Sequence, residues 1–276
     1  MNKFIIIANA IKTNSKHYVE ILQDAIKSNH ATQETVWIYD DTDLKESIKD
    51  MDFSGMDAAI VVGGDGTMIR AARALRQYDF PFVGVNLGTV GFLCEIDKEH
   101  IPESVKRLVE NDFEIEQRMM LCGVAETTGR DYALNEIAFG RGRQMNVVSL
   151  ALYVDGKHLI TYRGDGLVIA TPTGSTAYSL ACGGPILDPR SRMIIVTPIA
   201  PHSISSARSI VLEVGVEIEI RPVFRNDRNQ NDIVVCFDGT DTYSMTGPVG
   251  ICKANNDLKM IKMSETGFLD VLKHKL

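Results

Sequence analysis

The sequence of 276 residues has no excess of positive charge, no cysteine pair at metal-binding spacing and no repeat or low-complexity tract. Its formal net charge of −7 argues against general binding to nucleic acids or anionic membranes, because both need a basic face. The five cysteines are widely spaced and include no C-x-x-C motif. We therefore expect neither a disulfide framework nor a cysteine-based zinc site, and the composition favours a reducing cytoplasm.

Signals for secretion and for membrane insertion are also missing. The N-terminal apolar run stops at Asn9, and Lys12 follows without a small-residue cleavage pattern, so a first β-strand is predicted rather than a signal peptide. The longest charge-free stretch, residues 166–187, contains four glycines, two prolines and several hydroxyl side chains. It is too polar to span a bilayer. We expect no membrane and no nucleic-acid partner.

Two periodicities divide the chain. Up to about residue 115, short apolar runs alternate with helical patterns, which is typical of a parallel sheet with helices on both faces. After Met119 the period changes to two, as along residues 148–154 and 210–220, and the next helical pattern is at 268–275. The pattern predicts an α/β domain over residues 1–117 and a β-domain, layered or barrel-like, over 118–261.

The strongest local signal is a glycine-rich turn in residues 59–69. An apolar run ends at Gly63, glycines surround Asp65, and Thr67 is placed to cap the following helix. Glycines let a backbone approach a ligand, and a helix N-terminus offers free N–H groups to phosphate. The turn lacks the Walker A lysine and the third glycine of the dinucleotide fingerprint. A carboxylate in such a loop would repel phosphate unless it faces a hydroxyl group or a metal ion. The alternative is a plain glycine-rich turn in which Asp65 is solvated.

Two further segments have a composition suited to ligands. Residues 83–93 form a second glycine loop after the next strand, which fits the crevice at the carboxyl ends of a parallel sheet, with an irregular connection as the alternative. Asn135 and Glu136 interrupt an apolar strand, where a carboxylate is unfavourable unless it is paired. Asparagine can bond an adenine edge and glutamate can hold ribose hydroxyls, against the alternative of a structural polar pair.

A third segment, residues 162–185, combines glycines with hydroxyl side chains. Asp165 lies between two glycines, and Thr and Ser residues cluster beside Gly174, which gives a neutral polar lining for a ligand. Tyr178 could stack on a flat ring and Arg163 could bind a phosphate. The alternative is a loop rich in serine and threonine.

Other signals indicate structure rather than chemistry. His202 is read as a structural histidine, and the pair at 238–239, Asp-Gly, is read as a turn after an apolar strand. Neither an H-E-x-x-H helix nor a Ser/His/Asp order points to hydrolysis.

In this order, the motifs resemble those of the NAD kinases, which phosphorylate NAD to NADP. The matching segments, which lie between about residues 58 and 210, are 63–67 (GGDGT), 86–93 (NLGTVGFL), 135–136 (NE), 164–166 (GDG), 171–178 (TPTGSTAY) and 201–203 (PHS). Similarity is weaker at both ends. The first motif is shared with lipid kinases and, more loosely, with phosphofructokinases. The segment 171–178 together with 135–136 is much more specific to NAD kinases.

The resemblance implies a fold, cofactors and partners. The fold would be a Rossmann-like N-terminal domain and a C-terminal β-sandwich, with the tail 262–276 returning to the first domain. The phosphoryl donor would be ATP or inorganic polyphosphate, with Mg²⁺ or another divalent cation, and the acceptor NAD. The protein would be a cytoplasmic homo-oligomer, often a tetramer in this family. The charged segment 225–232 departs from the family pattern; we expect a surface loop that affects local subunit contacts and leaves the chemistry unchanged.

The resemblance also assigns residues. Asp65 would be the catalytic acid near the 2′-hydroxyl of NAD, as base or as positioning group. The loop for the phosphates of the phosphoryl donor would comprise Gly63, Gly64, Gly66 and Thr67. Arg163 would meet the new 2′-phosphate and Asp165 the nicotinamide end. The implied NAD contacts are Asp65, Gly66, Phe92, Asn135, Glu136, Arg163, Asp165, Thr173, Thr176, Ala177, Tyr178 and Ser179. No residue is implied as a metal ligand.

Two other functions stay open on the sequence. A lipid kinase of related fold would need an apolar substrate cleft, which the polar segment 171–178 disfavours. A non-catalytic dinucleotide sensor would keep the pocket but would need no acid at position 65.

Overall fold

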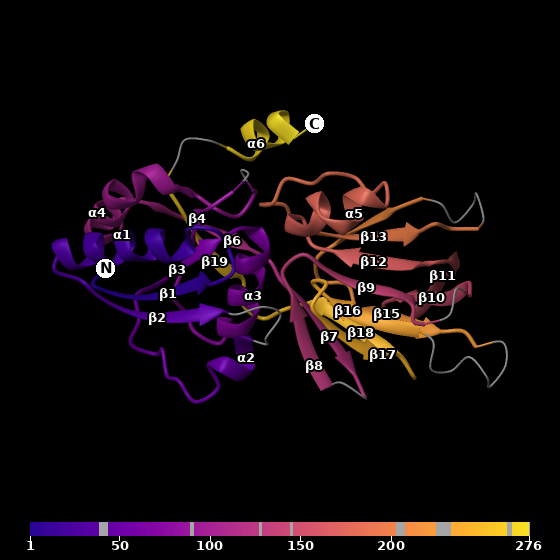
Figure 1. Cartoon of the computed structure of the whole chain (residues 1–276). Helices are drawn as coiled ribbons and strands as arrows, with labels where there is room; N and C mark the ends of the chain where they lie inside the picture. The colour runs from indigo at the N-terminus through magenta and orange to yellow at the C-terminus, as the bar shows by residue number, and fades with distance from the viewer. Residues whose placement is uncertain are drawn as a thin grey trace. The chain divides into compact units, whose positions relative to one another are not determined.

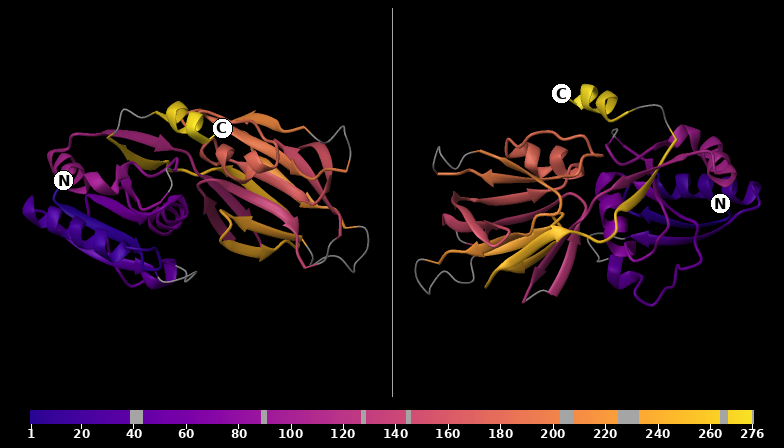
Figure 2. Two further views of the ribbon diagram at one scale, coloured as in Figure 1. Left: turned by 45° about the horizontal axis from the view of Figure 1, so that its top comes forward. Right: turned by 180° about the vertical axis from the view of Figure 1, so that it is seen from behind.

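The computed structural model describes residues 1–38, 44–88, 91–126, 129–143, 146–202, 208–224, 233–263 and 267–275. The chain forms two compact units, Met1–Gln117 with Leu258–Leu276, and Arg118–Asp257. It returns to the first unit through strand β19 (Leu258–Lys262), drawn in yellow in Figures 1 and 2. The surface loop predicted at 225–232 lies outside the described residues.

The first unit is an α/β unit with a parallel sheet. Apart from β19, its elements are β1 (Lys3–Asn9), α1 (Ser15–Ser28), β2 (Thr32–Ile38), α2 (Leu44–Ser47), β3 (Ala58–Gly63), α3 (Asp65–Leu75), β4 (Phe82–Asn86), β5 (Ile96–Asp97), the 3₁₀ turn η1 (Lys98–His100), α4 (Ile101–Glu110), β6 (Glu114–Arg118) and α6 (Phe268–Lys275). The sheet order is β2-β1-β3-β4-β19-β6, with β5 beside β4. Neighbours from β2 to β19 pair in parallel, as β5 does with β4.

The core of this unit follows from its apolar pattern. Residues 4–8 of β1 and all of β3 are fully buried, as expected for central strands of a parallel sheet covered on both faces. Helices α1 and α4 bury one face each, with Leu22 and Ile26 on α1 and Val105 and Leu108 on α4 in the same hydrophobic cluster as β1.

The second unit consists of two antiparallel sheets. Its strands are β7 (Leu121–Ala125), β8 (Gly129–Ala133), β9 (Glu136–Arg141), β10 (Val148–Val154), β11 (Lys157–Gly164), β12 (Gly166–Ala170), β13 (Met193–Ile199), β14 (Ile210–Glu213), β15 (Ile218–Pro222), β16 (Ile233–Phe237), β17 (Asp241–Ser244) and β18 (Val249–Lys253). The orders are β11-β10-β15-β18-β7-β8 and β14-β13-β12-β9-β16-β17. One hydrophobic cluster joins both sheets, for example Leu121 and Leu150 of one with Phe139 and Ile169 of the other. The predicted fold class, a parallel α/β domain followed by a β-sandwich, is confirmed.

Three local predictions need correction. The alternating run 210–220 is two strands in different sheets, β14 and β15, separated at Gly215 with φ 114°. The alternation continues across the break because both strands face the same core. The second unit also contains a 3₁₀ turn η2 (Thr173–Thr176) and a short helix α5 (Tyr178–Ala181), which are too short to show a helical period. The third correction concerns the helix cap and is described with the site.

None of the helices in the described ranges combines the length and hydrophobicity needed to cross a bilayer.

Candidate functional site

The first cluster of predicted residues lies where β3 and β4 end. Gly63 and Asn86 are opposite each other in these neighbouring parallel strands, so both glycine loops start at one edge of the sheet. Helix α3 begins at Asp65 and its N-cap is Gly64, without a side-chain cap. The prediction that Thr67 caps the helix is wrong: its side chain is buried inside the first turn and lies against Gly63. The free N–H groups of this turn remain available to an anion.

Backbone N–H groups hold the carboxylate of Asp65. Phe92 N donates to Oδ2 at 2.9 Å, and Leu93 N donates to Oδ1 at 3.2 Å. Burial first, and then the charge of Asp65, raises the pKa of the Cys94 thiol to about 12, so this thiol adds no second negative charge beside the carboxylate. A methyl group on Gly91 would overlap the carboxylate of Asp65, which explains why this position is glycine. Residues 91–94 therefore form a cradle that fixes the orientation of Asp65.

The C-terminal segment supports the same loop within the first unit. The ring of Phe92 packs against Phe268 of α6, with ring centroids 5.6 Å apart, and Lys275 Nζ lies 5.2 Å from the centroid of Phe92. Lys262 of β19 forms an ion pair with Glu95, whose side chain is almost fully buried. The C-terminal residues therefore contact both ends of the segment 92–95, whose backbone binds Asp65.

The second cluster is at the start of β9 in the second unit. Asp238, which has a φ of 49°, accepts hydrogen bonds from the backbone N–H groups of Leu134 (2.8 Å), Asn135 (2.7 Å) and Glu136 (3.0 Å). The sequence indicated only a turn at Asp238, and the turn is present, but no local pattern could show that its carboxylate reaches a strand more than 100 residues away. Asp238 fixes the backbone from which the side chains of Asn135 and Glu136 project.

Glu136 is the most perturbed acid of this cluster. Its side chain is buried, and its Oε2 has no hydrogen-bond partner among the described residues. Burial, and then the charge of Asp238, raises the pKa of Glu136 to about 7, against a smaller opposing effect of the Tyr178 backbone N–H. A buried carboxylate with an unused oxygen is unfavourable unless a ligand supplies hydrogen-bond donors.

The segment 171–179 is locked to the start of β9. Thr171 Oγ1 donates to the Leu134 carbonyl at 2.6 Å and accepts from Gly174 N at 3.0 Å, and a methyl group on Gly174 would overlap the Asn135 carbonyl. The segment therefore lies directly against the residues that precede Glu136.

The hydroxyls and the ring of this segment have different environments. Thr173 is buried and accepts from Arg118 at 3.4 Å, and Thr176 donates to the Thr173 carbonyl. Ser179 is fully buried and hydrogen-bonds to Thr197 at 2.9 Å. Tyr178 is 43% exposed, and its ring side chain is the part of this segment most open to a ligand.

Asp165 and Arg163 lie at the junction of β11 and β12. Asp165 forms an ion pair with Arg141 at 3.0 Å, a partner that the sequence analysis missed because Arg141 lies 24 residues earlier on β9. Burial raises the pKa of Tyr178, and the charges of Cys182, Asp165 and Glu136 raise it further. Arg163 is exposed, and its carbonyl accepts from the backbone N–H of His202 at 2.8 Å.

The structure thus collects the predicted residues into three groups. The loop 63–67 and Phe92 surround Asp65 in the first unit. In the second unit, the segment 171–179 lies against the start of β9 with Asn135 and Glu136, whereas Arg163 and Asp165 lie at the opposite end of the β9–β12 pair. In the part of the chain that is described, no group of three or more His, Cys, Asp or Glu side chains could hold a metal ion.

A helix N-terminus set in a glycine-rich turn, together with a β-sandwich that carries a buried acid with an unused oxygen, is typical of a nucleotide phosphotransferase. Comparison with known proteins supports this class. Residues 3–113 match the model of the ATP-NAD kinase N-terminal domain, and residues 134–263 match that of the C-terminal domain. The chain therefore belongs to the ATP-NAD kinase family and is a phosphotransferase that acts on NAD.

Individual relatives agree with this assignment. The chain is 36% identical to an NAD kinase of Agathobacter rectalis, over all of this chain and 99% of that protein. An NAD kinase of Bacteroides fragilis is 36% identical over 85% of this chain and 82% of its own length. Among solved structures, an Archaeoglobus fulgidus NAD kinase in complex with ATP has a TM-score of 0.81 at 25% identity, covering 99% of this chain and 98% of its own. A yeast NADH kinase complexed with NADH has the same fold, with a TM-score of 0.85 at 20% identity over 99% of this chain and 87% of its own.

Proposed function

We propose that Asp65 receives the 2′-hydroxyl of the adenosine ribose of NAD and orients it toward the γ-phosphorus of ATP. The observation that supports this role most is the cradle at residues 91–94, which fixes both carboxylate oxygens of Asp65 beside the first turn of α3. Phosphoryl transfer needs an aligned nucleophile and neutralised charge more than covalent help. An acid held in one orientation suits the first need, and it can take up the hydroxyl proton as the new P–O bond forms.

The phosphates of the phosphoryl donor would bind at the first turn of α3. Gly63, Gly64, Gly66 and Thr67 belong to this turn, where free N–H groups and the helix dipole favour negative charge. Among the described residues, a methyl group on Gly64 or Gly66 would meet nothing within 4 Å, so the backbone here is open to a ligand. ATP would bind here through its phosphates, and inorganic polyphosphate would offer the same groups.

A divalent cation, Mg²⁺ in the first instance, would accompany the nucleotide. Mg²⁺ in kinases takes most of its ligands from substrate phosphates and water, so it needs few from the protein. When bound, the cation would neutralise charge on the phosphates. The residues present therefore fit a cation carried by the nucleotide.

NAD would be held by the second unit. Glu136, with its unused oxygen, would accept hydrogen bonds from ribose hydroxyls, and Asn135 would bond the adenosine moiety. Tyr178 would stack on a ring, while Thr173, Thr176, Ala177 and Ser179 shape the backbone around it. Asp165 would face the nicotinamide end, and the exposed Arg163 would meet the new 2′-phosphate. Phe92 would add an apolar contact beside Asp65.

A coupled assay tests the assignment. Purified protein receives NAD, Mg²⁺ and either ATP or polyphosphate, and an NADP-specific dehydrogenase converts any NADP that forms. Formation of NADP by the wild-type chain ranks the phosphoryl donors. Protein that binds NAD but forms no NADP with either compound would instead be a dinucleotide sensor.

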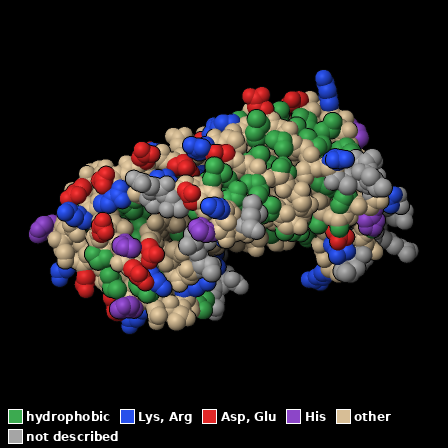
Figure 3. Space-filling view, turned by 90° about the horizontal axis from the view of Figure 1, so that it is seen from above, with side chains coloured by type: hydrophobic (Ala, Val, Ile, Leu, Met, Phe, Trp, Pro, Cys, Tyr) green, Lys and Arg blue, Asp and Glu red, His purple; other side chains and the backbone are tan. Residues whose placement is uncertain are grey.

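We also propose a cytoplasmic homo-oligomer, in which a tetramer is the expected state. Seen from above, hydrophobic side chains gather on the second unit (Figure 3). Its exposed apolar residues include Leu180, Met193 and Val211, and such a surface is typical of subunit contacts. The five cysteines are free thiols, which supports a reducing compartment. Light scattering on the wild type and on Val211→Lys tests the assembly; an unchanged mass in the variant would exclude this surface as the contact.

A further inference from the structure

Two of the five cysteines stand directly opposite each other in the second unit. Cys122 on β7 and Cys252 on β18 are paired in the antiparallel register of these neighbouring strands. The Cα atoms of such opposed residues lie about 4.5–5.5 Å apart, and both side chains project from the same face. A disulfide spans Cα separations of roughly 4.4–6.8 Å, so no strand has to move far for these sulfurs to bond.

The face of the sheet that carries the pair is the outer one. Leu121 and Ile251, the neighbours of the two cysteines in sequence, belong to the hydrophobic core between the sheets, so the alternation of the strands puts Cys122 and Cys252 on the other side. The register therefore places the two thiols next to each other on that face; burial first, and then the neighbouring Cys252, raises the pKa of Cys122.

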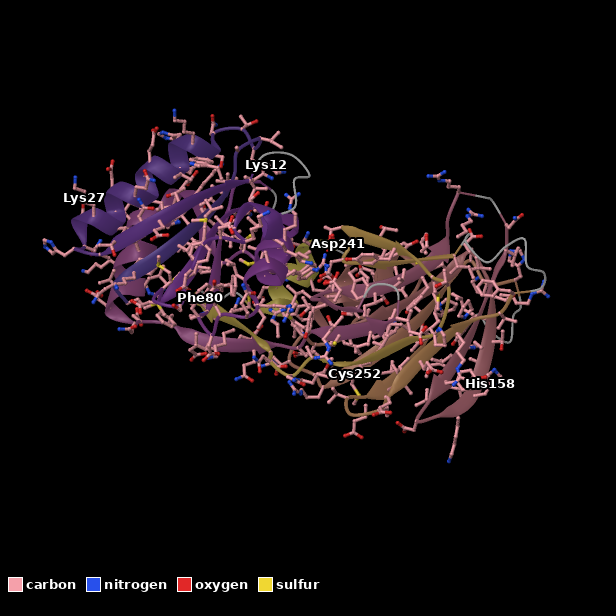
Figure 4. All side chains as sticks on the ribbon, turned by 90° about the horizontal axis from the view of Figure 1, so that it is seen from below. Lys12, Lys27, Phe80, His158, Asp241 and Cys252 are labelled. Atoms are coloured by element: carbon pink, nitrogen blue, oxygen red, sulfur yellow. The ribbon has the colours of Figure 1, made fainter. Side chains whose placement is uncertain are left out.

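The two thiols differ in their access to solvent. Cys252 is exposed, while Cys122 is buried. The difference follows from the neighbouring strands. On the far side of Cys252, the pairing with β15 ends at Ile251, so no strand among the described residues covers Cys252 there. Cys122, in contrast, has a paired strand on both sides, with Cys252 of β18 on one and Tyr132 of β8 on the other. Figure 4 marks Cys252 on the second unit. One thiol can therefore meet an oxidant, and the other stands directly opposite it on the neighbouring strand.

We propose that Cys122 and Cys252 form a dithiol site that a hydroperoxide oxidises to a disulfide. Cys252 loses its thiol proton, and its thiolate attacks the hydroperoxide: an S–O bond forms, the O–O bond breaks, and the leaving oxyanion (hydroxide in the case of hydrogen peroxide) takes up that proton as water. The Cys122 sulfur then attacks the sulfenic sulfur of Cys252. The S–S bond forms, the S–O bond breaks, and hydroxide leaves with the Cys122 proton as a second water. Two thiols lose two electrons, and one peroxide gains them.

The position of the pair determines what the bond does. The second unit runs from Arg118 to Asp257, so Cys122 and Cys252 lie close to the places where the chain enters and leaves it. The disulfide ties the first strand of the sandwich to the last and encloses nearly the whole unit in one covalent loop. A loop of this length stabilises strongly because it restricts the unfolded chain. None of the proposed site residues belongs to the pair, so the bond acts as a staple of the second unit.

Oxidation of the full-length protein tests the site. Reductant is removed, hydrogen peroxide is added, and free thiols are then blocked with N-ethylmaleimide. Trypsin and chymotrypsin are used together, since trypsin alone leaves Cys236 and Cys252 on one peptide. Non-reducing mass spectrometry is expected to find one linked pair of peptides with Cys122 and Cys252, and a loss of two titratable thiols per chain. The midpoint of thermal unfolding is expected to rise by roughly 5 °C or more, and a reductant should reverse it.

Two variants sharpen the test. Cys252→Ser removes an exposed thiol with little risk to folding, and it should abolish the linked peptides and the rise in unfolding temperature. Cys236→Ser is the matched control, because Cys236 is also a strand cysteine but is opposed by Ala138 and Thr242, and it should behave as the wild type. The proposal is overturned if Cys252 goes to the sulfinic acid while Cys122 stays free, or if Cys252 links two chains instead.

Discussion

The two units treat their central carboxylates in opposite ways. Asp65 sits at the start of a helix, and backbone N–H groups from Phe92 and Leu93 occupy both of its oxygens. Glu136 lies buried at the start of a strand, with one oxygen unpartnered among the described residues and with a pKa raised to about 7. The first acid is satisfied by the protein itself, and the second is left for a ligand to satisfy.

This difference separates two tasks. A group that aligns a reacting hydroxyl must stay in one place through the reaction, and a rigid cradle of backbone donors achieves that. A group that recognises a ligand gains affinity when the ligand supplies the hydrogen bonds that the free protein lacks. The comparison predicts that damage around Asp65 lowers kcat, whereas damage around Glu136 raises the KM for NAD.

The largest effect is expected from Asp65→Asn. The amide keeps the size of the side chain but cannot take the hydroxyl proton, so kcat should fall by at least ~10²-fold while NAD still binds. The coupled NADP assay and equilibrium binding of NAD measure the two quantities. Asp24→Asn, at an exposed position of α1, is the control. Near-wild-type turnover in Asp65→Asn would remove the role assigned to Asp65.

Gly91→Ala is expected to have the next largest effect. The added methyl group overlaps the Asp65 carboxylate and forces it to move, which should lower kcat by ~10–100-fold with little change in the KM for NAD. Gly88→Ala is the matched control in the same loop, because a methyl group there meets nothing within 4 Å among the described residues. Equal losses in the two variants would show a general effect on the loop instead of a displacement of Asp65.

Glu136→Gln is expected to raise the KM for NAD by ~10-fold, the scale of one hydrogen bond to a charged group, with a smaller change in kcat. In the wild type, the KM should fall as the pH rises through about 7, because the ionised carboxylate accepts from ribose hydroxyls. The variant should lack this dependence. A wild-type KM that is constant from pH 6 to 8 would contradict the assigned role.

The same residue should affect stability with the opposite pH dependence. Burial raises the pKa of Glu136 from 4.5 to about 7, so the folded state holds its proton more tightly than the unfolded state. The stability that this proton contributes is present below pH 4.5 and is lost as the pH rises to about 7, a change of about 3 kcal/mol at most. Denaturant unfolding measures the free energy of unfolding at each pH. Between pH 4.5 and about 7 this free energy should fall for the wild type relative to Glu136→Gln. The control is Glu213→Gln, a substitution at an exposed position of β14. If the unfolding free energies of the wild type and Glu136→Gln changed equally with pH, the raised pKa of Glu136 would be contradicted.

The smallest effect is expected from Arg141→Met. Its ion pair with Asp165 is about one-third exposed on both sides, so its removal should lower the free energy of unfolding by less than ~1 kcal/mol. The KM for NAD should rise only a few-fold, because Asp165 loses orientation and keeps its charge. A loss as large as that of Glu136→Gln would place Arg141 in direct contact with the ligand.

The change of period was enough to predict a parallel α/β domain followed by a β-domain. The apolar run of β3 followed by glycines around Asp65 predicted a strand, a turn and a helix N-terminus, because these depend on neighbouring residues. Alternation predicted a layered or barrel-like β-domain, and the family resemblance implied the sandwich. The alternation did not show that residues 210–220 belong to two sheets, since both strands face one core.

Contacts between distant segments were decided by tertiary structure alone. Asp238 reaches the backbone of β9, Arg141 pairs with Asp165, and Gly91 makes room for Asp65. The residues near these positions in the sequence do not indicate such partners. An aspartate in a turn or a glycine in a loop looks the same in the sequence whichever distant residue it contacts in the fold. The sequence determined the elements and the chemical groups; folding determined which oxygen is already satisfied and which is left for the substrate.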